Sequence, residues 1–112
     1  MIHEHIINNR KFTFACHSWE TSRAWGHEVR LHLNGEEVSK ARVRYYNRTW
    51  ESYCYQSCMK CAVDRLISKE KDLIISHWKW VNNKSRITKK QKEELFANDS
   101  YLQDLQALYE KI

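Results

Sequence analysis

The feature that most constrains the fold is an alternation of apolar and polar side chains in three segments of the first half. The segments read KFTFACHS, GHEVRLHL and VSKARVRYYN and cover residues 11–18, 26–33 and 38–47. Because side chains alternate between the two faces of a β-strand, a period of two residues predicts half-buried strands. We therefore predict a three-stranded antiparallel sheet within residues 1–48. Its apolar face would carry Phe12, Phe14, Cys16, His27, Val29, Leu31, Leu33, Ala41, Val43 and Tyr45.

The opposite face of this predicted sheet is basic. A cluster of cations on one face attracts anions such as phosphates and carboxylates. Charged side chains also cover ordinary outer surfaces that bind nothing. Two interpretations therefore stay open, a solvated outer face and a contact surface for phosphate or carboxylate. The candidate binding residues are Lys11, Arg30, His32, Lys40, Arg42 and Arg44.

The connection between the second and third predicted strands can be tested for register. A two-residue turn at Asn34–Gly35 would place Lys40 on the apolar face, opposite Val29. A three-residue loop over Leu33–Gly35 would instead pair Val29 with Ser39 and keep the lysine on the polar face. Such a loop needs a left-handed residue, which glycine tolerates best. We therefore expect the three-residue loop.

The second half of the chain changes to a helical period. We predict a long helix over residues 49–82 that lies across the sheet, with Thr49 as its N-cap. The pattern weakens at residues 69–72, where we expect a bend or a break. The stripe of this helix that faces the sheet consists of Tyr55, Met59, Ala62 and Leu66, flanked by Cys58 and Val63.

Two capping boxes predict short helices within residues 88–112. In this motif a serine or threonine caps the helix, and a glutamine three residues later reaches back to the cap. The pairs Thr88 with Gln91 and Ser100 with Gln103 both fit. The chain as a whole therefore predicts a single α+β domain, with a sheet packed on a long helix and further helices at the C-terminus.

Three of the four cysteines, Cys54, Cys58 and Cys61, fall within the predicted long helix, at the edge of its apolar stripe. Residues seven apart are separated by about 10.5 Å along a helix axis, whereas sulfurs bound to one zinc ion lie within about 4 Å of each other. An unbroken helix therefore lets an adjacent pair share a metal, but not all three cysteines. The pair Cys58 and Cys61 has the commoner ligand spacing.

A metal site built on this pair needs two further ligands from the sheet. Two other interpretations stay open, because cysteines also serve as small core residues or as reactive thiols. The candidate ligands of a structural Zn²⁺ are Cys58, Cys61, Cys16 and His17, with His27 and Cys54 as alternatives.

Sequence signals for catalysis are weak. The chain has two glycines, at positions 26 and 35, too few and too far apart for a loop that cradles phosphate. It contains neither a GxSxG nor an HExxH motif. We therefore expect a protein that is not an enzyme.

The segment SHWKWVNNKSRITKKQK, residues 76–92, interleaves Trp78 and Trp80 with cations. Aromatic stacking combined with positive charge is typical of grooves that bind single-stranded nucleic acid. In the alternative interpretation, both tryptophans pack under the C-terminal helices. A second pair, Trp19 and Trp25, flanks a polar loop, where exposed tryptophans would suit a protein contact and half-buried ones would close the end of the sheet.

The overall charge favours an anionic partner. The chain of 112 residues has a formal net charge of +5. No run of about 18 apolar residues occurs, so we expect no membrane span. The N-terminus lacks the apolar region of a signal peptide, so we expect a cytoplasmic protein, and in the cytoplasm disulfides are rare.

A motif at the end of the third predicted strand resembles a known group of proteins. The stretch RVRYYNRTWESYCYQS, residues 42–57, is similar to small proteins from phages and mobile elements of Firmicutes, and the resemblance extends over about residues 12–67. The motif residues are Tyr45, Tyr46, Asn47, Arg48, Thr49, Trp50, Glu51 and Tyr53.

The resemblance implies a non-enzymatic binding protein that acts in the host bacterial cytoplasm. Such elements encode anti-CRISPR proteins, so it most concretely implies an inhibitor that binds Cas9 and blocks guide or DNA engagement. The resemblance also implies metal binding, since these inhibitors include metalloproteins. The cysteine cluster departs from the motif, which usually has apolar residues at those helix positions, and this departure favours the zinc interpretation. The alternative function is a nucleic-acid-binding accessory protein that uses the basic sheet face and the tryptophan–lysine segment.

Overall fold

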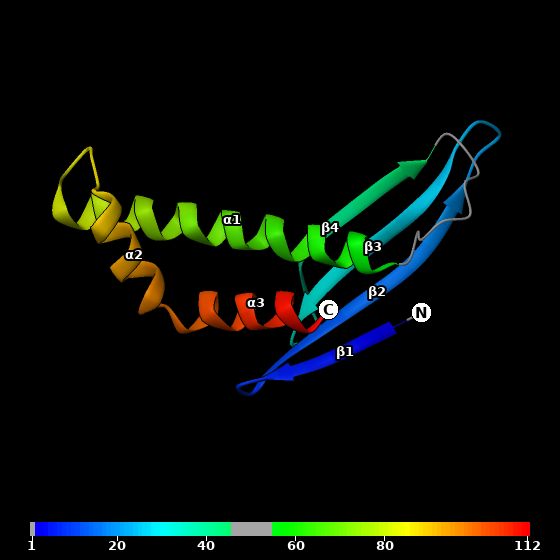
Figure 1. Ribbon diagram of the computed structural model, residues 1–112, viewed down its shortest axis with the longest axis horizontal. Coiled ribbons are helices and arrows are strands. Elements are labelled where there is room, and N and C mark those ends of the chain that lie inside the picture. Colours follow the sequence, from blue (N-terminus) through cyan, green and yellow to red (C-terminus); the bar gives the residue numbers. More distant parts are fainter. Residues whose placement is uncertain (1, 46–54) are drawn as a thin grey trace.

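The computed structural model describes residues 2–45 and 55–112, and in this part of the chain four strands precede three helices (Figure 1). The strands form one antiparallel sheet in the order β1-β2-β3-β4. This arrangement confirms the α+β class. The elements are β1 (Ile2–Ile7), β2 (Arg10–Glu20), β3 (Trp25–Leu33), β4 (Glu36–Tyr45), α1 (Tyr55–Asn82), α2 (Lys89–Ala97) and α3 (Ser100–Lys111).

The prediction of three strands was wrong by one, because it missed β1. The missed strand pairs with β2 through a two-residue turn at Asn8 and Asn9, whose φ angles are 49° and 69°. Asparagine tolerates this left-handed conformation, which a tight hairpin turn needs at both positions. The alternation of β1 is also inverted, since Ile2 and Ile6 point to the outer face and are largely exposed.

The predicted faces of the other three strands are confirmed. Phe12, Phe14, Val29 and Leu31 are fully buried on one face. Helix α1 packs on β3 and β4, and α3 lies beside α1 and reaches β1, so both helices cover this same face (Figure 1). No described helix covers the other face, which we call the outer face.

The turn between β3 and β4 differs from the predicted three-residue loop. Leu33 pairs with Glu36, which leaves a two-residue turn at Asn34–Gly35. A β-bulge beside Leu31 then shifts the register, so that Val29 lies opposite Ala41. The bulge inserts one extra residue into β4, and the lysine at position 40 therefore keeps its place on the outer face without a longer loop.

Helix α1 is continuous from Tyr55 to Asn82, so the predicted break at residues 69–72 is absent. The predicted N-cap Thr49 lies outside the described residues. The first half of α1 packs on the sheet, whereas its second half extends past the sheet and is flanked by α2 (Figure 1). The residues of α1 that are buried are Cys58, Met59, Ala62, Val63, Leu66 and Ile67.

One of the two predicted capping boxes is confirmed. Thr88 accepts a hydrogen bond from the backbone of Gln91, and the Gln91 side chain accepts one from the Thr88 backbone. The second prediction was wrong by one residue, because Asp99 rather than Ser100 is the N-cap of α3 and accepts from the backbone N–H of Leu102 at 2.8 Å. Aspartate is among the strongest capping residues, so the helix begins one position earlier than predicted.

A buried carboxylate ties α3 to the β1–β2 hairpin. The Asp104 side chain accepts hydrogen bonds from Asn8, at 2.7 Å, and from the Arg10 guanidinium, which also lies over the Tyr101 ring at 5.0 Å. An ionised side chain in the core is tolerated only when it is paired and hydrogen-bonded. This cluster therefore determines where the C-terminal helix docks on the sheet.

We predict that Asp104→Ala lowers the free energy of unfolding by about 2–4 kcal/mol, because Arg10 and Asn8 lose their shared partner in a partly buried site. Urea denaturation followed by circular dichroism measures the change. The exposed Glu110 on the same helix provides a control, since Glu110→Ala should cost less than about 0.5 kcal/mol. Equal losses for the two variants would contradict the role of this cluster.

Candidate functional site

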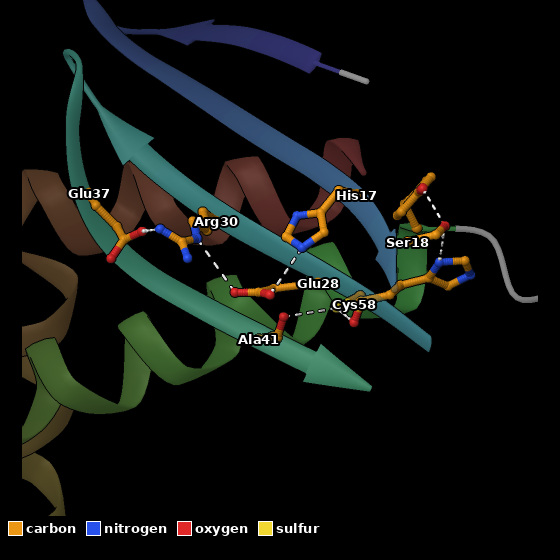
Figure 2. Close-up of polar contacts among 9 residues, drawn as sticks. His17, Ser18, Glu28, Arg30, Glu37, Ala41 and Cys58 are labelled. Atoms are coloured by element: carbon orange, nitrogen blue, oxygen red, sulfur yellow. Dashed lines mark hydrogen bonds and ion pairs between the residues drawn. The ribbon is translucent and has the colours of Figure 1, made fainter. Parts of the chain in front are cut away.

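All six basic residues predicted for the polar side of the sheet lie on the outer face. The strand registers and the alternation of side chains place them there, away from α1 and α3. Figure 2 shows part of this face, with His17, Glu28 and Arg30 on the side of the sheet away from the helices. The six residues are Lys11, Arg30, His32, Lys40, Arg42 and Arg44.

Acidic side chains neutralise part of this positive face. Glu28 lies 3.1 Å from His17 Nε2 and 3.4 Å from Arg30 Nε, and Arg30 also reaches Glu37 at 3.6 Å (Figure 2). Lys11 pairs with a glutamate of β1 in the same way. Exposed ion pairs of this kind contribute little to stability, but they reduce the attraction of Lys11 and Arg30 for an external anion.

The cations of β4 differ, because Lys40, Arg42 and Arg44 form no ion pair with any carboxylate of the described residues. All three are exposed. They alternate along one strand, about 6.6 Å apart, and β4 is an edge of the described sheet. The result is a row of positive charge along one edge of the outer face, in which Glu28 stands opposite Arg42 in the register.

Trp19 forms a platform for two of these cations. Its ring lies 4.1 Å from the guanidinium carbon of Arg42 and 5.5 Å from that of Arg44, measured to the ring centroid. A guanidinium stacked on an indole is attracted by the ring face, and this arrangement leaves the N–H groups at the edge of the guanidinium oriented to donate to an anion. Sequence reasoning considered Trp19 only as a residue beside a loop, and it missed this contact.

Gly26 makes the position of Trp19 possible. The two residues face each other across β2 and β3. A Cβ atom at position 26 would lie 2.8 Å from Cζ2 of Trp19 and 1.8 Å from the carbonyl oxygen of Val43. The indole therefore lies directly on the backbone of β3, an arrangement in which an aromatic residue covers a strand glycine. A glycine inside a strand pattern was the available signal for this close approach.

The four candidate zinc ligands are not gathered in one place. Cys16 is buried on the core face, whereas His17 points to the outer face, where it pairs with Glu28. Cys58 is 1% exposed, in the centre of the core rather than at its edge, and Cys61 is half-buried. The described residues contain no group of three or more histidine, cysteine or acidic side chains arranged to hold a metal. The alternative ligand Cys54 lies outside those residues, and the zinc site stays a prediction.

The thiol of Cys58 is engaged with the sheet. Its Sγ donates to the carbonyl oxygen of Ala41 at 3.3 Å (Figure 2), with the His27 carbonyl at 3.8 Å. Burial, and to a smaller degree the neighbouring Cys61, raises the pKa of Cys58 to about 11. Because the thiolate is the reactive form of cysteine, this residue is protonated and unreactive at neutral pH.

A second polar cluster joins β2, β3 and the start of α1. The Ser18 hydroxyl lies 3.1 Å from Nδ1 of the buried His27 and 2.8 Å from the Tyr55 hydroxyl. The rings of His27 and Tyr55 also contact each other, with centroids 4.5 Å apart. These contacts satisfy a buried imidazole and hold the N-terminal turn of α1 against the sheet.

The tryptophans of the second half lie on a different surface. Trp78 is half-buried and contributes to a groove between α1 and α2, whereas Trp80 is 80% exposed. Both belong to the part of α1 that extends past the sheet (Figure 1). The prediction that both tryptophans pack under the C-terminal helices is therefore confirmed in part for Trp78 and wrong for Trp80. The predicted binding residues lie on two surfaces, the outer face of the sheet and the end of α1.

The chain matches no protein-family model, and neither the curated proteins nor the solved structures include a significant match. None of the described helices combines the length and apolar character needed to span a membrane.

We predict that Gly26→Ala lowers the free energy of unfolding by about 3 kcal/mol, because the new methyl group must displace the Trp19 ring and a strand carbonyl. Gly35→Ala is the matched control. Position 35 has a φ of 88° but no atom within 4 Å of an added Cβ, so only the backbone conformation is strained and the cost is about 1 kcal/mol. Thermal or urea unfolding measures both, and a smaller loss for Gly26→Ala would refute the close approach.

We predict that stability falls with rising pH because of Cys58. Folding raises the pKa of this thiol from an ordinary value of 9.0 to about 11. Its contribution is therefore complete below about pH 9 and disappears as the pH rises through about 11, a loss of roughly 2–3 kcal/mol. Lysines and tyrosines titrate in the same range, so the measurement is the difference between the wild type and Cys58→Ser. That difference should change across this window, and a pH-independent difference would contradict the assignment.

Proposed function

We propose that this protein is a non-enzymatic binding protein whose outer face binds the phosphate backbone of a nucleic acid. One observation carries the proposal: Lys40, Arg42 and Arg44 form an exposed row with no ion pair to a carboxylate of residues 2–45 or 55–112, and two of them stack on Trp19. Cations that are not engaged in an ion pair attract an external anion more strongly than paired ones do. The row therefore supplies both charge and fixed geometry for phosphate.

The stacked arginines favour phosphate recognition in particular. A guanidinium binds phosphate through two parallel hydrogen bonds, and stacking on Trp19 reduces the side-chain entropy that would be lost on binding. The net charge of +5 adds long-range attraction to a polyanion. Because the proposed contacts are to phosphate, which carries no sequence information, we expect binding with weak sequence preference.

The second candidate is the inhibitor of Cas9 that the resemblance implies. The observation that favours a protein partner is the pair Ile2 and Ile6, which are large apolar residues exposed on the same outer face. Exposed apolar side chains next to charges are typical of protein contacts. In this proposal the outer face binds Cas9 and prevents it from engaging guide or target.

The test of nucleic-acid binding is fluorescence anisotropy with labelled single-stranded and duplex oligonucleotides at several salt concentrations. The triple variant Lys40→Ala, Arg42→Ala, Arg44→Ala should bind on the order of tenfold more weakly at moderate salt. The slope of log affinity against log salt should decrease in magnitude by roughly 2–3, because three phosphate contacts are lost.

Three cations of the helical region provide the matched control. The variant Lys89→Ala, Lys90→Ala, Lys92→Ala carries the same charge change but leaves the outer face intact, so its affinity should decrease less. A larger loss in this control would move the nucleic-acid site to the tryptophan–lysine segment. If the wild type binds no oligonucleotide but co-elutes with nucleic-acid-free Cas9, the second candidate replaces the first.

A further inference from the structure

A groove lies where α1 extends past the sheet and meets α2. Its volume is about 470 Å³, within the range of clefts that bind ligands. The walls are mostly apolar, and Trp78 supplies an aromatic surface. The lining residues include Leu73, Ile74, Trp78, Val81 and Leu95.

This part of α1 presents an apolar stripe that no described element covers completely. Leu73 is 53% exposed and Val81 is 59% exposed, although both line the groove. They lie eight residues apart, about 12 Å along the axis, with Ile74 and Trp78 beside them on the same side. In the first half of α1 the corresponding stripe is buried by the sheet. The second half therefore has the pattern of a helix that packs against a partner.

The charge around the groove is positive. Residues 73–92 include six lysines or arginines and no aspartate or glutamate, and Asp72, Glu93 and Glu94 stand just outside this range. None of these six cations forms an ion pair with a carboxylate of residues 2–45 or 55–112. Lys84 lies over Trp78, with Nζ 5.9 Å from the ring centroid, and so borders the groove itself. Asp99, the acid in the lining, already caps α3 through Leu102.

We propose that this groove binds an acidic amphipathic helix of a partner protein. Two helices already form the walls, and a third helix would bury Leu73 and Val81 through apolar residues three and four positions apart, the usual mode of helix-in-groove recognition. Acidic residues on its flanks would face the cations of residues 73–92. Four aliphatic side chains of the lining fit leucine or isoleucine, namely Leu73, Ile74, Val81 and Leu95. The lining also holds the rings of Trp78 and His77, but the larger aliphatic share favours protein over stacked bases.

Charge also argues against a second copy of this chain as the occupant. Two such grooves brought face to face would oppose six cations to six cations, and like charges across an interface are unfavourable. The groove lies on a different surface from the Trp19 platform, since it belongs to α1 and α2 (Figure 1). The protein would therefore hold an anionic ligand on the sheet and a helix at the other site.

The experiment uses a fluorescently labelled peptide of about 15 residues, with leucines at helical spacing and glutamates elsewhere. Anisotropy should show saturable binding to the full-length protein. The double variant Leu73→Ser, Val81→Ser should weaken binding at least tenfold, and because both side chains are more than half exposed, its melting temperature should stay close to that of the wild type. Lys84→Glu should also weaken binding.

Two matched controls define the site. A scrambled peptide of the same composition keeps the charge but lacks the apolar stripe, and it should bind at least tenfold more weakly. The protein variant Lys40→Ala, Arg42→Ala, Arg44→Ala alters only the sheet surface and should keep the full affinity for the amphipathic peptide. These controls separate this inference from the proposed nucleic-acid function, so either can fail alone.

Four outcomes would overturn the inference. These are no binding at peptide concentrations of about 1 mM, equal binding of the scrambled peptide, and unchanged peptide affinity in the Leu73→Ser, Val81→Ser variant. The fourth is evidence that the groove binds a different kind of partner. If that variant instead loses affinity for single-stranded oligonucleotides, or changes a dimer into a monomer in sedimentation, the groove binds nucleic acid or a second copy.

Discussion

The structure depends on the burial of one face of the sheet and only one. Phe12, Phe14, Val29 and Leu31 pack against α1 and α3 and are inaccessible to water. Their burial supplies the largest favourable term in folding. Because both helices are on this side, the outer face of the described sheet stays open, and charged residues can occupy it without loss of stability. The candidate site is a consequence of this one-sided packing.

The same packing explains the two separate surfaces. Helix α1 has 28 residues, about 42 Å of helix, which is longer than the sheet it covers. Its first half completes the core, whereas the second half extends past the sheet beside α2 and leaves Leu73 and Val81 exposed. The described structure thus has a basic sheet face at one site and an apolar groove at another.

Sequence patterns predicted correctly those features that depend on a single strand or helix. The faces of β2, β3 and β4 and the capping box at Thr88 followed from periodicity and capping chemistry. β1 was missed because two of its three isoleucines, Ile2 and Ile6, point outward, so apolar residues in this strand do not mark its buried face. The loop prediction failed because a β-bulge beside Leu31 shifts the register between β3 and β4. The sequence contains no clear signal for this bulge. The cysteine set was proposed from spacing, and adjacent strand residues such as Cys16 and His17 necessarily point to opposite faces.

The sequence by itself determined which side chains of each strand share a face, because that periodicity is a property of the local backbone. Only the tertiary structure decided which residues meet across the fold. Arg42 stacks on Trp19 from two strands away, and Asp104 pairs with Arg10 across 94 positions of the chain. Such contacts depend on register, on the bulge and on where α3 docks. These are collective results of packing, and no single segment of the sequence contains them.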